Sequence, residues 1–551
     1  MNSWIEDESD DEDSYDQGSA SETQDAESQT SEEDDEIDLE NLKLDDDSTP
    51  KSLYSSKSGI TWSSIPYPSK KAKSSNDTSE KAGPTKLTED VSSIQDAFIC
   101  FISEKIIQKI LIYSNMERTR NIASNEESED ITMMELKAFI GLLLLAGLLG
   151  KSKKNIKSLW KRSPLESPIF KATMGRSRFE KIISCLRFDD KTTREERKKT
   201  DKFAAIREIW SDFEDNIKTC YVPGPYVTID EQLLPFRGKC PFRQFIPKKP
   251  DKYGSKFWLC VDVQTYYVFN AFPYLGRQPD QERQTKIGAS VVLELLKPLY
   301  GSNRNVTIDN FFTSVQLAKE LQMRNLTLIG TLRKNKPEIP MEFQSNKNRE
   351  IGSSLFGFQD DLTLVSFVPK QNKAVLVLSS KHHDNQVDIK TGKPIIILDY
   401  NKTKGAVDTV KRGTKRWPLC IFFGMIDIAA INALVIWKTK NPQWNENKKY
   451  QRRLFLEELG LSLVSDLLDF RSKTSKFLNK DIEHALAIVG YPMVKNLPEP
   501  NGNSTQSKKR KRCSICEDPK DKKTSIQCSR CSKFVCNEHS VKIIYCANCA
   551  K

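Results

Sequence analysis

The sequence lacks basic residues at its N-terminus and long apolar runs, and it has only four histidines. The first fifty residues hold 21 Asp or Glu and a single basic residue, Lys43, so nothing there resembles the positively charged start of a signal peptide. The longest apolar run, 138–149, is shorter than the roughly 20 residues that a helix needs to cross a bilayer. We therefore expect a buried helix at 138–149, no secretion signal and no membrane partner.

Cysteine is scarce before residue 513 and dense after it. Six cysteines are scattered over the earlier part: Cys100, Cys185, Cys220, Cys240, Cys260 and Cys420. The other seven follow residue 512. This distribution is typical of a reducing compartment with one local metal-binding region, and not of a disulfide scaffold. His382, His383 and His484 lack ligand partners at useful spacing, so we interpret them as surface or satisfied core residues.

Charge is distributed unevenly along the chain. Residues 1–50 carry −20, and since the whole chain carries +10, residues 51–551 carry +30. A body this basic suggests a polyanionic partner, for which nucleic acid is the usual candidate. The alternative is a basic surface that merely keeps the protein soluble.

Residues 1–92 are rich in Asp, Glu, Ser, Thr and Lys and poor in large apolar groups. We predict that this region is disordered, because it cannot bury enough surface to offset its ordering entropy. The acidic arm could compete with DNA for the basic body, or it is a solvated tail.

Apolar residues at helical spacing predict helices over 93–220, whereas alternating and β-branched runs predict strands from residue 221 onward. The expected strands are 226–233, 256–263, 266–272, 305–309 and 327–332, with helices at 289–299 and 314–323. Later we expect strands at 362–368 and 374–378, helices at 417–437 and 450–468, and a linker at 495–507. Three strands followed by helix, strand, helix and strand is an order compatible with an RNase H-like α/β core.

The tetrapeptide Val-Thr-Ile-Asp occurs twice, at 227–230 and 306–309. In a strand its Val and Ile point to one face and its Thr and Asp to the other. If the two strands pair in parallel, Asp230 and Asp309 become neighbours at one sheet edge and repel each other unless they share a divalent cation. Mg²⁺ held in this way by carboxylates, water and phosphate oxygens is suited to phosphoryl transfer. Alternatively, Asp309 only ends a strand or caps a helix.

A basic segment with interleaved aromatic residues follows the first of these aspartates. Its cations are Arg237, Lys239, Arg243, Lys248, Lys249, Lys252 and Lys256, and its aromatic residues are Phe236, Phe242, Phe245, Tyr253 and Phe257. Cations suit phosphates, and aromatic rings stack on unpaired bases, so the segment is a candidate DNA-binding surface. The alternative is an ordinary basic hairpin surface.

The C-terminal cysteines form four pairs of metal-ligand spacing. The pairs are Cys513 with Cys516, Cys528 with Cys531, Cys536 with His539, and Cys546 with Cys549. Eight such ligands are enough for two tetrahedral Zn²⁺ ions. A basic run precedes them: Lys508, Lys509, Arg510, Lys511 and Arg512. That run is interpreted as a nuclear localisation signal or a phosphate contact, with a solvated charge run as the alternative.

Several stretches closely resemble the conserved blocks of piggyBac transposases. The first block corresponds to 228–243, continued at 246–250 and 252–254, and the second to 307–314. The strand after the second block corresponds to 330–336, the third block to 404–408, and its downstream Arg-Trp-Pro marker to 416–418. The resemblance covers about 95–551.

The resemblance implies a metal-dependent DNA transposase. It assigns catalysis and binding of Mg²⁺ or Mn²⁺ to Asp230, Asp309 and Asp408, and it adds Arg333 and Lys336 to the DNA-binding residues. Members of the family excise DNA through hairpin ends and join it at TTAA sites, acting in the nucleus as dimers on two transposon ends. The resemblance also implies two zinc sites. One zinc ion is shared by Cys513, Cys516, Cys536 and His539, and the other by Cys528, Cys531, Cys546 and Cys549.

The implied architecture is multidomain. An RNase H-like α/β catalytic core, 221–339 and 401–440, carries a β-rich insertion at 340–400. A helical dimerisation and DNA-binding domain combines 93–220 with 441–494. A linker, 495–512, leads to the zinc-binding cross-brace module at 513–551.

The third block departs from the family pattern. In the family, a second Asp follows the first by three residues, and Lys411 stands at that position here. The family then has about a dozen residues before the Arg-Trp-Pro marker, whereas this chain has only a few before Arg416, including Gly413. We therefore predict that the chain binds DNA but excises a transposon poorly. An active transposase, a domesticated DNA- or chromatin-binding protein and, least favoured, a RING- or PHD-like protein-binding module remain the competing interpretations.

Overall fold

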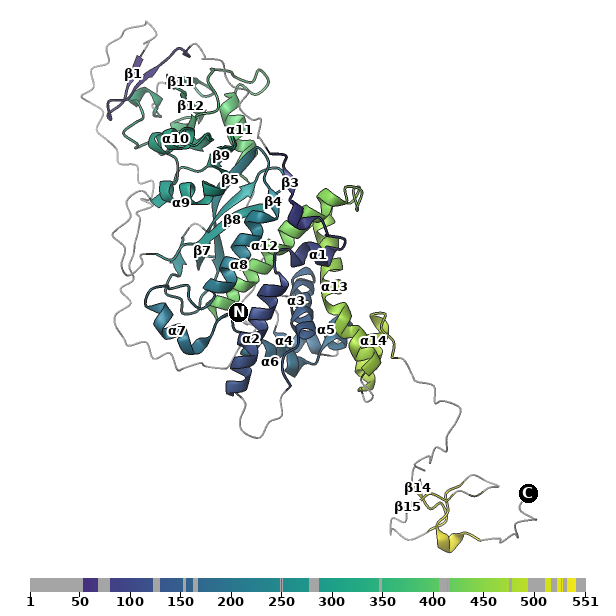
Figure 1. The fold of residues 1–551 in the computed structure, drawn as a ribbon. Coiled ribbons are helices and arrows are strands. Elements are labelled where there is room, and N and C mark those ends of the chain that lie inside the picture. The colour runs from purple at the N-terminus through teal and green to yellow at the C-terminus, as the bar shows by residue number, and fades with distance from the viewer. Residues whose placement is uncertain are drawn as a thin grey trace. The chain divides into compact units, whose positions relative to one another are not determined.

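The computed structural model (Figure 1) consists of two compact units, Met1–Met493 and Val494–Lys551. The residues it describes are 53–67, 80–121, 129–151, 155–161, 167–247, 249, 251–276, 287–345, 349–405, 414, 416–474, 478–493, 511–516, 523–526, 528 and 533–541. The predicted acidic arm, 1–50, lies outside them.

The larger unit is organised around one mixed sheet, in which the described residues contribute eleven strands. The five central strands are β5 Tyr226–Pro235, β7 Tyr253–Asp262, β8 Val268–Pro273, β9 Asn305–Ile308 and β10 Thr327–Thr331. They lie in the order β8-β7-β5-β9-β10, and β6 Gln244–Phe245 also pairs with β7. The β8-β7 and β7-β5 pairs are antiparallel, whereas β5-β9 and β9-β10 are parallel. This mixed sheet fits the RNase H-like core expected from the order of elements.

The predicted insertion does not form a sheet of its own. Its strands are β11 Ser354–Gln359, β12 Leu362–Lys370 and β13 Lys373–Ser379. β13 pairs with β10, and β12 and β11 follow outward, so these strands extend the core sheet.

The predicted disorder of 1–92 is wrong for a segment around residue 60 and for 80–92, where β3 Gly83–Pro84 pairs with a later strand and Val91 is buried. β1 Leu53–Ser55 and β2 Thr61–Ser63 form a hairpin, and β2 pairs with β11 through Ser63 and Phe358. The side chain of Trp62 is fully buried, and its indole N–H donates to the carbonyl of Glu338 at 3.1 Å. Burial of Trp62, with Tyr54 packed edge-on against Phe343, therefore anchors this segment.

Helices surround the sheet. Those that follow its later strands are α9 Ile287–Leu296, α10 Val315–Gln322 and α11 Ile395–Thr403, with short 3₁₀ turns η2 Lys297–Leu299 and η3 Met341–Phe343. The long apolar helix α12 Trp417–Lys440 packs on β5 and β8, and the Asn432 side chain bonds both the N–H and the C=O of Val268, at 2.8 and 2.9 Å. Among the described residues, α12 is the one helix long and apolar enough to cross a membrane, and 89% of its most apolar window is buried in the protein.

Most of the remaining helices of this unit form a helical body, whereas α7 Lys191–Lys198 lies apart from it and α8 Arg207–Thr219 packs beside β8 of the sheet (Figure 1). The helices of the body are α1 Ile94–Ile99, α2 Glu104–Asn121, α3 Met133–Leu148, α4 Ile156–Trp160, α5 Pro168–Thr173, α6 Arg176–Cys185, α13 Gln451–Thr474 and α14 Lys480–Ile488. Nearby, β3 Gly83–Pro84 pairs with β4 Tyr221–Val222, and η1 Lys86–Thr88 follows β3.

Helices α3 and α13 cross at two glycines, although they are far apart in sequence. A Cβ atom on Gly141 would lie 2.8 Å from the carbonyl oxygen of Gly460, and one on Gly460 would lie 2.7 Å from Leu145 Cγ. Helix α3 contains the predicted buried run 138–149 and begins with a capping box formed by Thr132 and Glu135. The late helices therefore pack into the body that the early helices build.

In the smaller unit the described elements are β14 Lys511–Arg512, β15 Lys523–Thr524 and η4 Asn537–His539. β14 and β15 pair antiparallel. β14 lies in the predicted linker 495–512, and β15 and η4 lie in the predicted zinc module 513–551.

Candidate active site

The two Val-Thr-Ile-Asp segments pair in parallel, as predicted. Ile229 of β5 lies opposite Ile308 of β9, and the Thr228 hydroxyl donates to the Thr307 carbonyl at 3.1 Å. Asp230 and Asp309 each follow the last residue of this pairing, so both carboxylates lie at the same edge of the sheet.

Asp309 also shapes its own turn. Its carboxylate accepts the backbone N–H of Phe311 at 2.9 Å, and the Thr313 hydroxyl donates to the Asp309 carbonyl at 2.7 Å. A Cβ atom on Gly330 would overlap the Thr313 hydroxyl, and one on Gly288 would lie 2.8 Å from the Phe311 carbonyl oxygen. The turn is therefore held closely from two sides, which fixes where the Asp309 carboxylate points.

No described ion pair compensates the acidic edge, although the more distant charges of Lys249 and Lys256 oppose the rise in the pKa of Asp230 that burial causes. Burial raises the pKa of Asp309 to about 6, with a further contribution from the negative charge of Asp230. Burial also raises the pKa of Asp230. Among the described residues, no Lys, Arg or His nitrogen lies within 4.0 Å of either carboxylate. Two converging, partly buried and unpaired carboxylates are a donor set that suits Mg²⁺ or Mn²⁺.

Helix α11 ends beside this edge. The hydroxyl groups of Thr403 and Thr307 are 2.8 Å apart, and the Tyr400 hydroxyl is 3.4 Å from that of Thr331 at the end of β10. Burial raises the pKa of Tyr400, and the charges of Asp309 and Asp230 contribute. Tyr400 and Thr403 were not predicted from the sequence, although their three-residue spacing just before the third block was a usable signal. Asp408, the third predicted carboxylate, lies outside the described residues.

His382 has satisfied ring nitrogens, in line with its interpretation as a core residue. Its Nδ1 is 2.9 Å from the Ser379 hydroxyl and its Nε2 is 3.2 Å from the Asp399 carboxylate. Lys381 also contacts Asp399 at 3.0 Å, and these two partners hold the pKa of Asp399 down to about 2. This cluster ties α11 to the end of β13.

The predicted DNA-binding cations are mostly solvent-accessible. Arg237, Lys239, Arg243, Lys252 and Arg333 are exposed, Lys249 and Lys336 are partly buried, and Lys248 lies outside the described residues. The Arg243 guanidinium donates to the carbonyls of Arg237 and Gly238 at 3.0 Å and lies 5.4 Å from the centre of the Tyr253 ring.

The prediction that five aromatic residues of this segment stack on bases is wrong for three of them. Phe236, Phe242 and Phe257 are at most 2% exposed and belong to the core. Only Phe245 and Tyr253 are exposed, at 53% and 41%, with ring centres 4.8 Å apart.

In the smaller unit four predicted zinc ligands gather. Ligand atoms of Cys513, Cys516, Cys536 and His539 all lie within 4.8 Å of one another, and they are the set that the family resemblance assigns to one ion. Backbone N–H groups lower the pKa of Cys513 to about 6, whereas desolvation and the neighbouring thiols raise that of Cys516 to about 11. Several thiolates cannot ionise together at this spacing unless a cation joins them, so the set suits a metal ion. Of the second predicted set, Cys528 is described, and Cys531, Cys546 and Cys549 lie outside the described residues.

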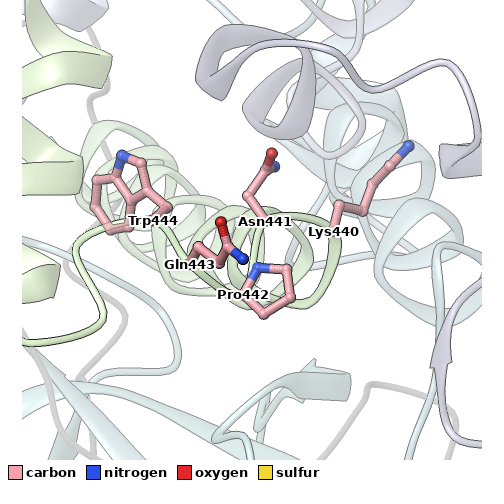
Figure 2. A pocket seen from close by; sticks show the side chains of 5 residues that line it. All are labelled: Lys440, Asn441, Pro442, Gln443 and Trp444. Carbon is pink, nitrogen blue, oxygen red and sulfur yellow. The ribbon is translucent and has the colours of Figure 1, made fainter.

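The larger unit has a surface hollow. It has a volume of about 520 Å³ and is lined by Lys440, Asn441, Pro442, Gln443 and Trp444, at the turn between α12 and α13 (Figure 2). The Lys440 ammonium has a structural role, because it donates hydrogen bonds to the backbone carbonyls of Thr88 and Glu89. Neither acidic residue of the sheet edge lines this hollow.

Comparison with known proteins gives concordant matches. A family model described as Transposase IS4 matches residues 93–434. PiggyBac transposable element-derived protein 3 of Homo sapiens is 25% identical over 391 residues, covering 65% of this chain and 64% of that protein. PiggyBac transposable element-derived protein 2 of Homo sapiens is 26% identical over 214 residues, covering 38% and 35%. The chain thus matches less than two thirds of the length of these relatives.

A solved structure gives a broader match. The cryo-EM structure of a piggyBac transposase synaptic complex with hairpin DNA has a TM-score of 0.70 and 36% sequence identity, and the match covers 85% of this chain and 100% of that chain.

Proposed function

Because the chain belongs to the piggyBac family of transposases, we propose that it binds DNA and cleaves it by divalent-metal-dependent phosphoryl transfer at Asp230 and Asp309. Within this proposal the substrates are transposon ends and TTAA target sites, and the protein acts in the nucleus as a homodimer. The solved relative is a complex with hairpin DNA, which supports DNA as the partner.

The observation that carries the proposal is the parallel register of β5 and β9. It brings two partly buried carboxylates to one edge, where no described cation pairs with them. A buried acidic pair of this kind destabilises the fold, and it is best explained by a ligand that offsets the charge.

The roles of the residues follow from this geometry. Asp230 and Asp309 would hold Mg²⁺ or Mn²⁺, which activates the attacking oxygen and stabilises the leaving one. The turn held by Gly288 and Gly330 keeps Asp309 in place. The exposed cations Arg237, Lys239, Arg243, Lys252 and Arg333 would contact phosphates, with Lys248, Lys249 and Lys336 as further candidates.

The test is Mn²⁺- or Mg²⁺-dependent nicking of a duplex that carries the element's own terminal repeat. We expect Asp230→Ala and Asp309→Ala to abolish nicking while duplex binding stays intact or becomes tighter, because each change removes a metal ligand and a negative charge together. The matched control is Asp361→Ala, at an exposed carboxylate in the loop between β11 and β12. Nicking at the wild-type rate in either active-site variant would refute the assignment.

We also propose that the C-terminal module holds two Zn²⁺ ions, one of them at Cys513, Cys516, Cys536 and His539. The approach of these four ligand atoms to within 4.8 Å supports the first site. The basic run 508–512 is proposed as a nuclear localisation signal, of which Lys511 and Arg512 fall within β14.

A second candidate function is DNA binding with impaired excision. The shortened segment after Asp408 favours it, since about a dozen family residues before Arg416 are reduced to a few. The flanking genomic DNA discriminates the two functions. Terminal inverted repeats with TTAA duplications favour an active element, and a lone gene favours a domesticated protein.

A further inference from the structure

A third carboxylate, that of Glu231, lies next to the acidic pair, and it differs from the other two in being paired. Lys256 Nζ is 2.9 Å from Glu231 Oε2, and Lys249 Nζ is 3.6 Å from Glu231 Oε1. The Lys256 side chain is 14% exposed and that of Lys249 is 38% exposed. The Lys256 pair is therefore the better shielded from solvent and the more strongly coupled.

An aromatic cage holds the ammonium of Lys256 in place. Its Nζ lies 3.9 Å from the centre of the Trp258 ring, 5.2 Å from that of Phe311 and 5.8 Å from that of Tyr274. The Trp258 and Phe311 rings are stacked, with centres 5.6 Å apart and planes 18° apart. Each ring attracts a cation, and the attraction is stronger away from water.

These contacts join the elements that carry the acidic pair. Glu231 belongs to β5 directly after Asp230, Lys256 and Trp258 belong to β7, and Phe311 belongs to the turn that Asp309 begins. Glu231 lies opposite Trp258 in the β5-β7 register, so both side chains share one face, while Asp230 points to the other.

We propose that Lys256 is a positioning residue for the metal site, a role that rests on the proposed function. It clamps β5 to the Asp309 turn, and it neutralises Glu231 so that the edge offers a divalent cation two free carboxylates instead of three. Glu231 is thereby kept from capturing the metal on the wrong face of the sheet.

The test measures Mn²⁺ binding to the full-length chain, by the electron paramagnetic resonance signal of free Mn²⁺, and does not depend on cleavage. Lys256→Met leaves Glu231 only the more exposed Lys249 as a partner, and we expect Mn²⁺ affinity to rise about three- to tenfold. Glu231→Gln leaves an unpaired ammonium, and we expect affinity to fall by a similar factor. In the double variant the two shifts should cancel, and Lys370→Met, at the exposed end of β12, should change nothing.

Two further variants separate charge from folding. Lys256→Arg keeps the charge and should keep Mn²⁺ affinity within about twofold. If Lys256→Met does not fold, Glu231→Gln and Lys256→Arg still decide the question. Equal Mn²⁺ affinities in all variants, or shifts of the same sign in both single variants, would overturn the role of Lys256. Unchanged Mn²⁺ binding in Asp309→Asn would instead contradict the proposed function, and with it this inference.

Discussion

At the scale of single residues, Asp309 makes the acidic edge depend on pH. Burial raises its pKa to about 6 in the folded chain, against about 4 in an unfolded chain. Between these values the folded protein holds a proton that the unfolded chain has released. Stability from this group is therefore lost as pH rises from about 4 to about 6 when no metal is bound.

We predict that Asp309→Asn stabilises the metal-free protein at neutral pH, by on the order of 1–3 kcal/mol, and has little effect near pH 4. Urea unfolding over this pH range, in buffer without added Mg²⁺ or Mn²⁺, measures the effect. Asp361→Asn, at an exposed carboxylate, is the control. A variant that is no more stable than the wild type at neutral pH would show that Asp309 is not strained by burial.

The repeated tetrapeptide was enough to predict the acidic pair, because the side-chain alternation of a strand and one parallel pairing fix both positions. The same local logic failed for Phe236, Phe242 and Phe257. Their burial is decided by distant partners, such as Phe203 and Trp417 around Phe242. A sequence in which basic and aromatic residues alternate does not show whether the aromatic rings are exposed for stacking or buried in the core.

At the scale of elements, the α3–α13 crossing holds the early and late helices together. We predict that Gly141→Ala destabilises the protein by about 1–3 kcal/mol, because its new Cβ would meet the rigid Gly460 carbonyl at 2.8 Å. Alanine normally favours a helix over glycine by about 1 kcal/mol, so the sign of the effect is diagnostic. Urea unfolding measures the effect. A stabilised Gly141→Ala variant would contradict the close crossing.

Most strands and helices could be predicted from periodicity, whereas the β1–β2 hairpin could not. Its two strands are only three residues long, and its stability comes from Trp62 packing at Gly357 and Phe343, some three hundred residues later in the chain. The pairing of β10 with β13 could not be predicted for a similar reason, because strand pairing across a long connection leaves no local sequence pattern.

At the scale of the whole molecule, the zinc module should behave as a metal-dependent unit. We predict about two Zn²⁺ per chain by elemental analysis of the purified protein, and about one after Cys516→Ser, because a site that loses a thiolate loses much of its binding energy. Cys185→Ser, at a buried cysteine of α6, should leave the zinc content unchanged. One ion or none in the wild type would contradict the two-site module.

We further predict that the chain binds its terminal repeats but excises an element poorly, and that restoring a family-length segment between Asp408 and Arg416 increases excision. A carboxylate displaced by about 1 Å can cost on the order of a hundredfold in rate, and the missing residues amount to two or more helical turns. An excision assay on the element's own repeats compares the two chains. Robust excision by the chain as it stands would show that Asp408 still reaches the metal site.

The central claim is that Asp230 and Asp309 together hold the divalent cations. The most direct measurement is the anomalous difference density of crystals of the full chain soaked in Mn²⁺. We predict a peak within about 2.5 Å of oxygen atoms of both carboxylates, with none on Glu231. Density on Glu231 instead, or no density at this edge of the sheet at saturating Mn²⁺, would contradict the claim.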